Sequence, residues 1–239
     1  MQTVILCGGK GTRAYPYTDY LPKPMLPVVG QPILLHVMRI FAEQGCREFV
    51  LSVGWRKEVI LDYFDRKTLD WNVQFVDTGV EADTGQRILG CRHLLGEKFF
   101  ATYADGLSDI RLDDLLKFHE SHGAPATLTS VPLRSQYGTV TCEADGKVIA
   151  FREKPVLHEH WINAGFFVFN SSVFDHWQGD NLERDVLPNL CNQRRLFAYR
   201  HDGFFKSMDT YKDQQEIEQL CADGHLRWKN PSAGQQSAP

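Results

Sequence analysis

Residues 4–13 read Val-Ile-Leu-Cys-Gly-Gly-Lys-Gly-Thr-Arg, an apolar run followed by a loop rich in glycine. The run Val4–Cys7 has the length and composition of a short buried strand, and glycine ends it because a residue without a Cβ readily takes turn conformations. In α/β proteins, ligands bind beyond the carboxyl ends of such strands. The stretch therefore predicts an α/β fold with a candidate binding loop at its start.

Strands and helices alternate through the rest of the first half. Pro32 is a favourable first helical residue, the apolar residues of 33–41 share one face, and Gly45 ends that helix. We expect further strands at 49–53, 73–76 and 99–103, and helices at 59–64 and about 112–123. This βαβ order predicts a mixed, mostly parallel sheet flanked by helices, as in Rossmann-like folds.

The second half contains more strands than helices. We expect β segments at 126–131, 138–142, 148–153, 162–169 and 196–200, and helices near 182–194 and 210–222. Asp145-Gly146 fits a hairpin turn. We expect this β-rich half to fold onto the first sheet as a single domain over residues 1–228, with 229–239 as a flexible polar tail.

Composition excludes several functional classes. With 26 basic and 30 acidic residues, the net charge of −4 disfavours a protein that coats nucleic acid or an anionic membrane. No apolar run approaches the ~18 residues of a membrane span, and the first one ends at Cys7, too early for a signal peptide. The 6 cysteines contain no C-x-x-C pair, which is typical of reduced proteins. We expect a cytoplasmic protein that binds neither nucleic acid nor membrane.

The glycine loop matches the dinucleotide fingerprint only formally. Residues 9–14 fit G-x-G-x-x-G/A, which makes a dinucleotide oxidoreductase the runner-up on this motif. However, the fingerprint requires an acidic residue about 20 positions further on, and residues 20–42 contain no Asp or Glu. Prolines at 16, 22, 24 and 27 also prevent a continuous helix there. No Gly-Lys-Ser/Thr closes a Walker A loop either.

The loop from 8 to 30 has the composition of an anion-binding site. Lys10, Arg13 and Lys23 stand against one acid, Asp19. Glycines let backbone N–H groups approach an anion, and nearby cations neutralise it. The prolines on both sides of Lys23 stiffen its backbone, which suits a phosphate-binding lysine. Taken alone, the loop is equally consistent with a glycine turn carrying solvated charges.

Two motifs together resemble a known signature. The stretch Gly8–Arg13 followed by Pro22-Lys23-Pro24-Met25 resembles that of sugar-1-phosphate nucleotidyltransferases. The resemblance continues through Asp105, 151–155, 162–168 and 208–210. Within the family, 71–79, 84–87 and 203–210 look most like glucose-1-phosphate cytidylyltransferases. The resemblance implies that CTP and α-D-glucose 1-phosphate give CDP-glucose and pyrophosphate.

The resemblance also implies roles for individual residues. Arg13, Lys23 and Asp105 are the expected catalytic residues, and Asp105 and Asp209 are the expected Mg²⁺ ligands. The implied nucleotide-binding residues are Gly8, Gly9, Gly11, Thr12, Thr84, Gly85 and Arg87. The implied sugar-phosphate-binding residues are Glu153, Lys154, Asn163 and Gly165. Without these motifs, loop capping by Asp105 and helix capping by Asp209 would explain both acids.

The implied reaction joins two anions. An ionised phosphate needs no general base, so the site has to align the reactants and neutralise charge, for which Mg²⁺ is the usual solution. We expect a nucleoside triphosphate and a sugar 1-phosphate as partners, and a homo-oligomer as the assembly. His158 and His160 resemble metal ligands, but we expect them to be solvent-exposed because no third ligand lies nearby in the sequence.

Four features leave the base and the sugar open. Ala104 and Gln86 each stand where the family has glycine, only six residues separate Phe64 from Trp71, and residues 137–140 look more like the thymidylyltransferases. The alternatives are dTTP, UTP or GTP, or an unusual sugar 1-phosphate. A different class, a non-catalytic nucleotide-sugar sensor, is disfavoured because the charged residues of the motifs are all present.

Overall fold

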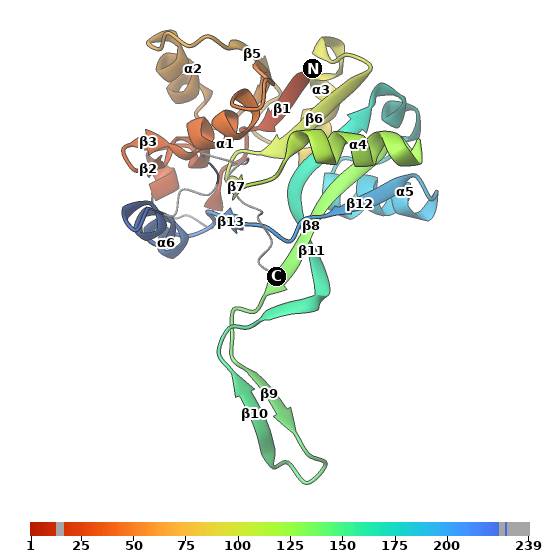
Figure 1. Ribbon diagram of the computed structural model, residues 1–239. Coiled ribbons are helices and arrows are strands. Elements are labelled where there is room, and N and C mark those ends of the chain that lie inside the picture. Colours follow the sequence, from red (N-terminus) through yellow and green to blue (C-terminus); the bar gives the residue numbers. More distant parts are fainter. Residues whose placement is uncertain (13–16, 225–227, 229–239) are drawn as a thin grey trace.

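The computed structural model describes residues 1–12, 17–224 and 228. Its centre is a seven-stranded sheet in the order β12-β8-β11-β6-β1-β4-β5 (Figure 1). In chain order these strands are β1 (Gln2–Leu6), β4 (Glu48–Val53), β5 (Asn72–Asp77), β6 (Lys98–Tyr103), β8 (Ala126–Arg134), β11 (Val156–Asn170) and β12 (Leu196–Arg200). The expected tail, 229–239, lies outside the described residues.

Only β11 runs against the other strands of this sheet. β1 pairs in parallel with β4 and β6, and β4 pairs in parallel with β5. β11 pairs antiparallel with β6 and β8, and β12 then pairs in parallel with β8. The predicted mixed, mostly parallel sheet is confirmed. Helices on both faces explain why the central strands are nearly continuous apolar runs.

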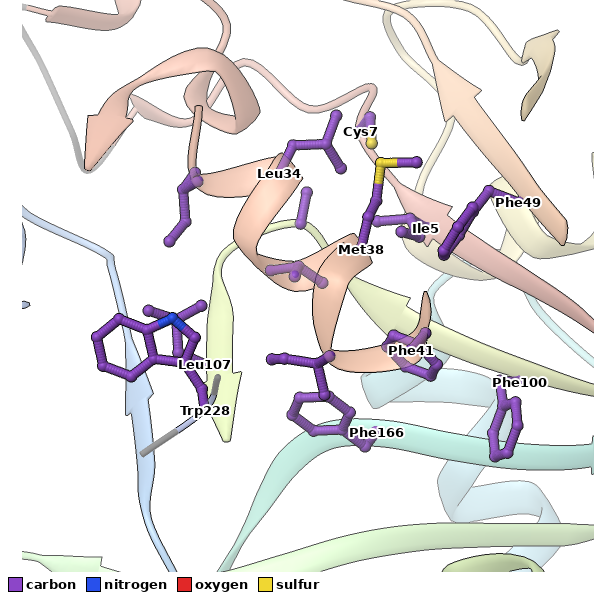
Figure 2. Close-up of a cluster of buried hydrophobic side chains, with 14 of the residues drawn as sticks. Ile5, Cys7, Leu34, Met38, Phe41, Phe49, Phe100, Leu107, Phe166 and Trp228 are labelled. Carbon is purple, nitrogen blue, oxygen red and sulfur yellow. The ribbon is translucent and has the colours of Figure 1, made fainter. Parts of the chain in front are cut away.

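Residues alternate along each strand between two hydrophobic cores. One core receives Ile5 and Phe100 from the sheet together with α1 (Ile33–Ala42), α2 (Lys57–Asp65), α4 (Leu112–His122) and α6 (Tyr211–Ala222). The other receives Val4 and Phe99 together with α3 (Thr84–Gly90) and α5 (Leu187–Asn192). Figure 2 shows the first core, where α1 lies over β1 and the Phe41 ring stacks on Phe166 at 5.9 Å.

The β-rich half differs from its expected placement. Instead of folding onto the sheet, β8, β11 and β12 extend it, because Phe167 and Phe169 of β11 are buried and pair with β6. β9 (Thr139–Cys142) and β10 (Val148–Arg152) leave the sheet and form a projecting hairpin (Figure 1). We call residues 135–155 the arm.

Several short elements were not predicted. β7 (Gly106–Ser108) pairs antiparallel with β13 (Phe205–Ser207), and β2 (Pro27–Val28) pairs with β3 (Gln31–Pro32). The helix α3 was also missed. Further short helices are η2 (Tyr17–Asp19), η3 (Lys23–Met25), η4 (Arg92–Leu94) and η5 (Ser171–His176). The helix predicted near 182–194 is present as η6 (Leu182–Val186) followed directly by α5. None of the helices in the described part of the chain is long and apolar enough to cross a membrane.

A candidate active site at the carboxyl end of the sheet

Three loops meet where β1, β4 and β5 end. A Cβ on Gly8 would lie 1.8 Å from Arg87 Nη1, and a Cβ on Gly54 would lie 2.4 Å from the Gly79 carbonyl oxygen. Glycine is required at position 54 because the Gly79 backbone approaches it so closely, and Gly8 packs against the Arg87 guanidinium. The predicted glycine loop therefore lies at the carboxyl edge of the sheet, where α/β proteins bind ligands.

Lys23 lies on a rigid turn beside this loop. The prolines flank it in η3, the Met25 N–H donates to the Pro22 carbonyl at 2.8 Å, and Pro24 and Met25 are buried. Gly11 packs on the lysine stem: its φ is +63°, and a Cβ there would lie 2.7 Å from Lys23 Cβ. The turn thus fixes the lysine backbone, as the Pro-Lys-Pro sequence indicates.

The unpredicted pair of β7 and β13 brings the two predicted carboxylates together. Asp105 follows β6 and immediately precedes β7, whereas Asp209 follows β13. Ser207 is paired with Gly106, and the Met208 N–H donates to the Asp105 carbonyl at 3.0 Å. These backbone contacts place side by side two acids that lie far apart in the sequence.

Lys23 binds both carboxylates. Its Nζ donates to Asp105 Oδ2 at 2.5 Å and to Asp209 Oδ1 at 2.8 Å, and its side chain is 12% exposed. Burial alone would lower the pKa of Lys23, but the charges and hydrogen bonds of Asp105 and Asp209 outweigh it and raise this pKa. The ammonium group therefore stays charged.

The same two acids suit a divalent metal. Both carboxylates already face one positive charge, and Mg²⁺ is usually bound through one or two carboxylates with the remaining ligands from phosphates and water. The described residues contain no group of three or more side chains that could hold a metal by themselves. His158 and His160 are exposed on β11, as expected. Asp105 and Asp209 therefore fit Mg²⁺ that is shared with substrate phosphates.

The other predicted nucleotide residues contact the protein itself. Arg87 is buried, and its guanidinium donates to Thr78 Oγ1 at 2.8 Å and to the Gly79 carbonyl at 3.0 Å. A Cβ on Gly85 would lie 2.6 Å from the Asp180 carbonyl oxygen. Thr84 donates from Oγ1 to Glu183 at 2.7 Å. Arg87, Gly85 and Thr84 therefore each pack against or bond to other parts of the protein. Nucleotide binding by these three residues stays a prediction.

Asn163 and Gly165 lie against the strand that leads to Asp105. Gly165, with φ of +77°, covers the ring of Tyr103, where a Cβ would lie 2.2 Å from Cδ2. Asn163 accepts from the Gly165 N–H at 2.9 Å and forms a hydrogen bond with Tyr103. The predicted sugar side therefore contacts β6 two residues before the candidate metal ligand.

Glu153 and Lys154 lie apart from that group, at the base of the arm. Both are exposed, and Lys154 Nζ lies 4.0 Å from Glu153 Oε1. Lys154 has a φ of +44°, which is strained for a residue with a side chain. Gly9 and Thr12 are exposed on the glycine loop, whereas the predicted Arg13 lies outside the described residues.

Residues 2–204 match the nucleotidyl transferase family. The chain belongs to this family. The glycine loop, the rigid lysine and the paired acids of this nucleotidyl transferase lie at the carboxyl edge of its sheet.

Individual relatives are similar to this chain over most of its length. A probable glucose-1-phosphate cytidylyltransferase of Bacillus subtilis is 39% identical, with 96% of this chain and 99% of that protein covered. The catalytic subunit beta of mannose-1-phosphate guanylyltransferase from Dictyostelium discoideum is 32% identical, with 89% and 62% covered. The structure of HddC from Yersinia pseudotuberculosis complexed with GMP-PN has a TM-score of 0.71 at 22% identity, covering 92% and 99% of the two chains. The predicted resemblance to sugar-1-phosphate nucleotidyltransferases is confirmed.

Sequence reasoning missed the elements that join these residues. Asp83-Thr84-Gly85-Gln86 is a capping box, in which Gln86 Oε1 accepts from the Asp83 N–H at 2.9 Å. That spacing could have predicted α3, and it gives the Gln86 side chain a role in capping this helix. Tyr103 and Glu183, which are described below, carried no motif signal.

Proposed function

We propose that this nucleotidyl transferase condenses CTP with α-D-glucose 1-phosphate to give CDP-glucose and pyrophosphate. The cluster of Lys23, Asp105 and Asp209 at the carboxyl edge of the sheet is the observation that carries the proposal. The choice of CTP and glucose 1-phosphate is supported by the 39% identical relative, which is named for that reaction and is covered over 99% of its length.

The reaction needs positive charge and alignment. A phosphate oxygen of the sugar 1-phosphate attacks the α-phosphorus of CTP, a P–O bond forms, and the bond to the departing pyrophosphate breaks in line. The nucleophile is already ionised, so no side chain has to remove a proton. A bound Mg²⁺ would supply charge neutralisation at the phosphates.

Different residues of the chain would stabilise charge, hold the metal and bind the triphosphate. Lys23 offers an ammonium group on a rigid turn, which suits the negative charge that shifts toward the leaving group. Asp105 and Asp209 would hold the metal on the side of Lys23. Backbone N–H groups of Gly8, Gly9 and Gly11 would bind the triphosphate, as glycine-rich turns do.

The sugar side is proposed to include Asn163, Gly165, Glu153 and Lys154. Asn163 and Gly165 already contact the strand that carries Asp105. For Glu153 and Lys154 to bind the same sugar, the base of the arm has to approach that strand when substrate is present. The strained φ of Lys154, +44°, supports a functional constraint at this position.

The base is the least constrained part of the proposal. An open groove of about 860 Å³ lies beside α3 and is lined by residues 76–82, Gln86, Leu89, Gly90 and Asp180. Gln86 and Asp180 offer polar groups that can hydrogen-bond a base. The 32% identical guanylyltransferase makes GTP the first alternative nucleotide.

Pyrophosphate release tests the reaction and its substrates together. The protein is incubated with Mg²⁺, with each of CTP, UTP, dTTP and GTP in turn, and with glucose 1-phosphate or mannose 1-phosphate. We expect the highest kcat/KM for CTP with glucose 1-phosphate. Activity with GTP or dTTP alone would overturn the cytidylyl assignment, and release without a sugar 1-phosphate would overturn the transfer reaction.

We also propose a cytoplasmic homo-oligomer. All six cysteines are free, which supports a reducing compartment. The arm supports self-association, because a two-stranded hairpin is marginally stable alone and this one exposes Val140, Val148 and Phe151 on one face. In a symmetric oligomer, the same face of a second copy can cover it.

A further inference from the structure

Tyr103, the last residue of β6, contacts the predicted sugar side. Its ring lies under Gly165, and its hydroxyl forms hydrogen bonds with Asn163 and Glu183. The hydroxyl donates its hydrogen to Oε1 of the Glu183 carboxylate.

Glu183 connects this hydroxyl to the predicted nucleotide side. Its Oε1 accepts from Tyr103, and its Oε2 accepts from Thr84 Oγ1 at 2.7 Å. The two donors lie 80 and 99 positions away in the sequence. One carboxylate therefore ties the end of β6, just before Asp105, to the first turn of α3.

The loop that carries Glu183 is held by other bonds. Asn181 Oδ1 accepts from the Glu183 N–H at 3.0 Å, and Asp185 Oδ2 accepts from the Asn181 N–H at 2.8 Å. The Leu182 N–H donates to Thr84 Oγ1 at 2.9 Å. These contacts fix the start of η6 without the Glu183 side chain, so local folding does not require the carboxylate.

The partners of Glu183 also fit a role in alignment. The residue is exposed, and within the described residues no basic side chain forms an ion pair with it. An exposed carboxylate that accepts from two neutral hydroxyls adds little electrostatic stabilisation. It does fix the separation of the two hydroxyls that donate to it.

Resting on the proposed function, we propose that Glu183 is a positioning residue for nucleotidyl transfer. Through Tyr103 it orients Asn163 and Gly165 on the sugar side, and through Thr84 it orients the start of α3 on the nucleotide side. Glu183 touches neither substrate. Its effect is therefore on the alignment of the two reactants in the transition state and not on the binding of each one alone.

The experiment separates kcat from KM in purified full-length protein. We expect Glu183→Ala to lower kcat about tenfold while both KM values stay within about twofold, because only alignment is lost. Glu183→Gln retains one acceptor oxygen and should recover part of the kcat. Glu218→Gln, an exposed acid on α6, is the matched control and should behave as wild type.

A double-mutant cycle distinguishes positioning from general loss of structure. Tyr103→Phe removes the same hydrogen bond, so we expect it to lower kcat to a similar extent and the double variant to be no slower than the slower single variant. Thermal unfolding of each variant, recorded alongside, shows that the assays are run on folded protein.

The possible failures are distinct. If wild type turns over and Glu183→Ala keeps its kcat, the inference about Glu183 is wrong and the proposed function stands. Raised KM values with unchanged kcat, or effects of the two single variants that multiply, would also overturn it. If wild type releases no pyrophosphate with any substrate pair, the proposed function fails and this inference fails with it.

Discussion

At the scale of single residues, Lys23 sets the charge balance of the site. It is an almost buried ammonium group between two carboxylates and is a cation that both of them share, so removing it leaves their negative charges facing each other. The sequence indicated a rigid phosphate-binding lysine. The structure adds that, before any substrate binds, this lysine already binds the acids predicted to hold Mg²⁺.

Asp105→Asn tests the metal role of that carboxylate. We expect kcat to fall at least about 100-fold, because an amide is a poor Mg²⁺ ligand and carries no charge. Pyrophosphate release measures the loss, and circular dichroism should show an unchanged fold. Asp202→Asn, an exposed acid on the same segment as β13, should keep full activity. Near-wild-type turnover in Asp105→Asn would remove the metal role.

The Lys23→Met variant tests whether the ammonium group and Mg²⁺ compete for the same two carboxylates. Without the lysine, Asp105 and Asp209 lose the cation that they share, so added Mg²⁺ should raise the melting temperature of this variant more than that of wild type. Thermal unfolding with and without Mg²⁺ measures this without any substrate. Lys57→Met, which frees the single carboxylate of Asp77, should show no such gain. Equal Mg²⁺ shifts in all proteins would contradict the shared site.

At the scale of elements, α4 is attached to the sheet by a chain of neutral histidines. The Ala124 N–H donates to His122 Nδ1 at 3.0 Å, so His122 Nε2 carries the proton and donates to Thr127 Oγ1 at 2.8 Å. His119 Nδ1 then accepts from the Thr127 hydroxyl at 2.8 Å, and His119 Nε2 donates to Asn170 at 3.1 Å. The arrangement requires both rings to be neutral.

This chain predicts acid sensitivity. Burial lowers the pKa of His119 and of His122 below the ordinary value of 6.5. Because the folded state resists protonation, stability is full above that value and falls as the pH drops below it. Urea unfolding at about pH 7.5 and about pH 5.5 should show the loss, and a His119→Gln, His122→Gln variant should lose less between the two.

Exposed histidines provide the control for this prediction. His158→Gln on β11 should keep the wild-type dependence of stability on pH, because its ring is exposed. If the double variant and wild type lose the same free energy of unfolding between the two pH values, the histidine chain is not the source of the acid sensitivity.

At the scale of the whole molecule, the structure has two parts: the central sheet, whose carboxyl edge carries the candidate site, and the arm, which projects from that sheet (Figure 1). The parallel strands β1, β4, β5 and β6 send their loops to one edge, which is where the glycine loop and Asp105 meet. Among the described residues, the side chains of the arm belong to neither hydrophobic core. Val140 is paired with Phe151, and Cys142 with Val148, so these side chains share one exposed face.

Phe151→Ser tests whether a second copy covers that face. Phe151 is 64% exposed in one chain, so its loss should leave the monomer fold intact while shifting the protein to a smaller assembly. Light scattering during size exclusion measures the mass. Thr141→Ala on the opposite face of the hairpin should keep the wild-type mass. A monomeric wild type, or an unchanged mass in Phe151→Ser, would contradict self-association through the arm.

Local patterns predicted most of the helices and strands because burial of one face places apolar residues at regular spacings along the sequence. The α1 helix follows Pro32 with a run of apolar residues, and the Asp145-Gly146 turn lies between β9 and β10 as expected. β7 and β13 show no such spacing, because a strand of three residues is too short to show a period of apolar residues. α3 was missed because its start is encoded in polar capping residues and not in an apolar face.

The sequence by itself determined the α/β class, the glycine loop, the rigid Lys23 and the family, because these depend on residue types at short spacings. Only the tertiary structure decided that Lys23, Asp105 and Asp209 meet at one point, that Arg87 is buried beneath the glycine loop, and that Glu183 joins Thr84 to Tyr103. The physical reason is that these contacts depend on sheet order and on pairing between strands such as β7 and β13, which bring together residues too distant along the chain for any local pattern to relate.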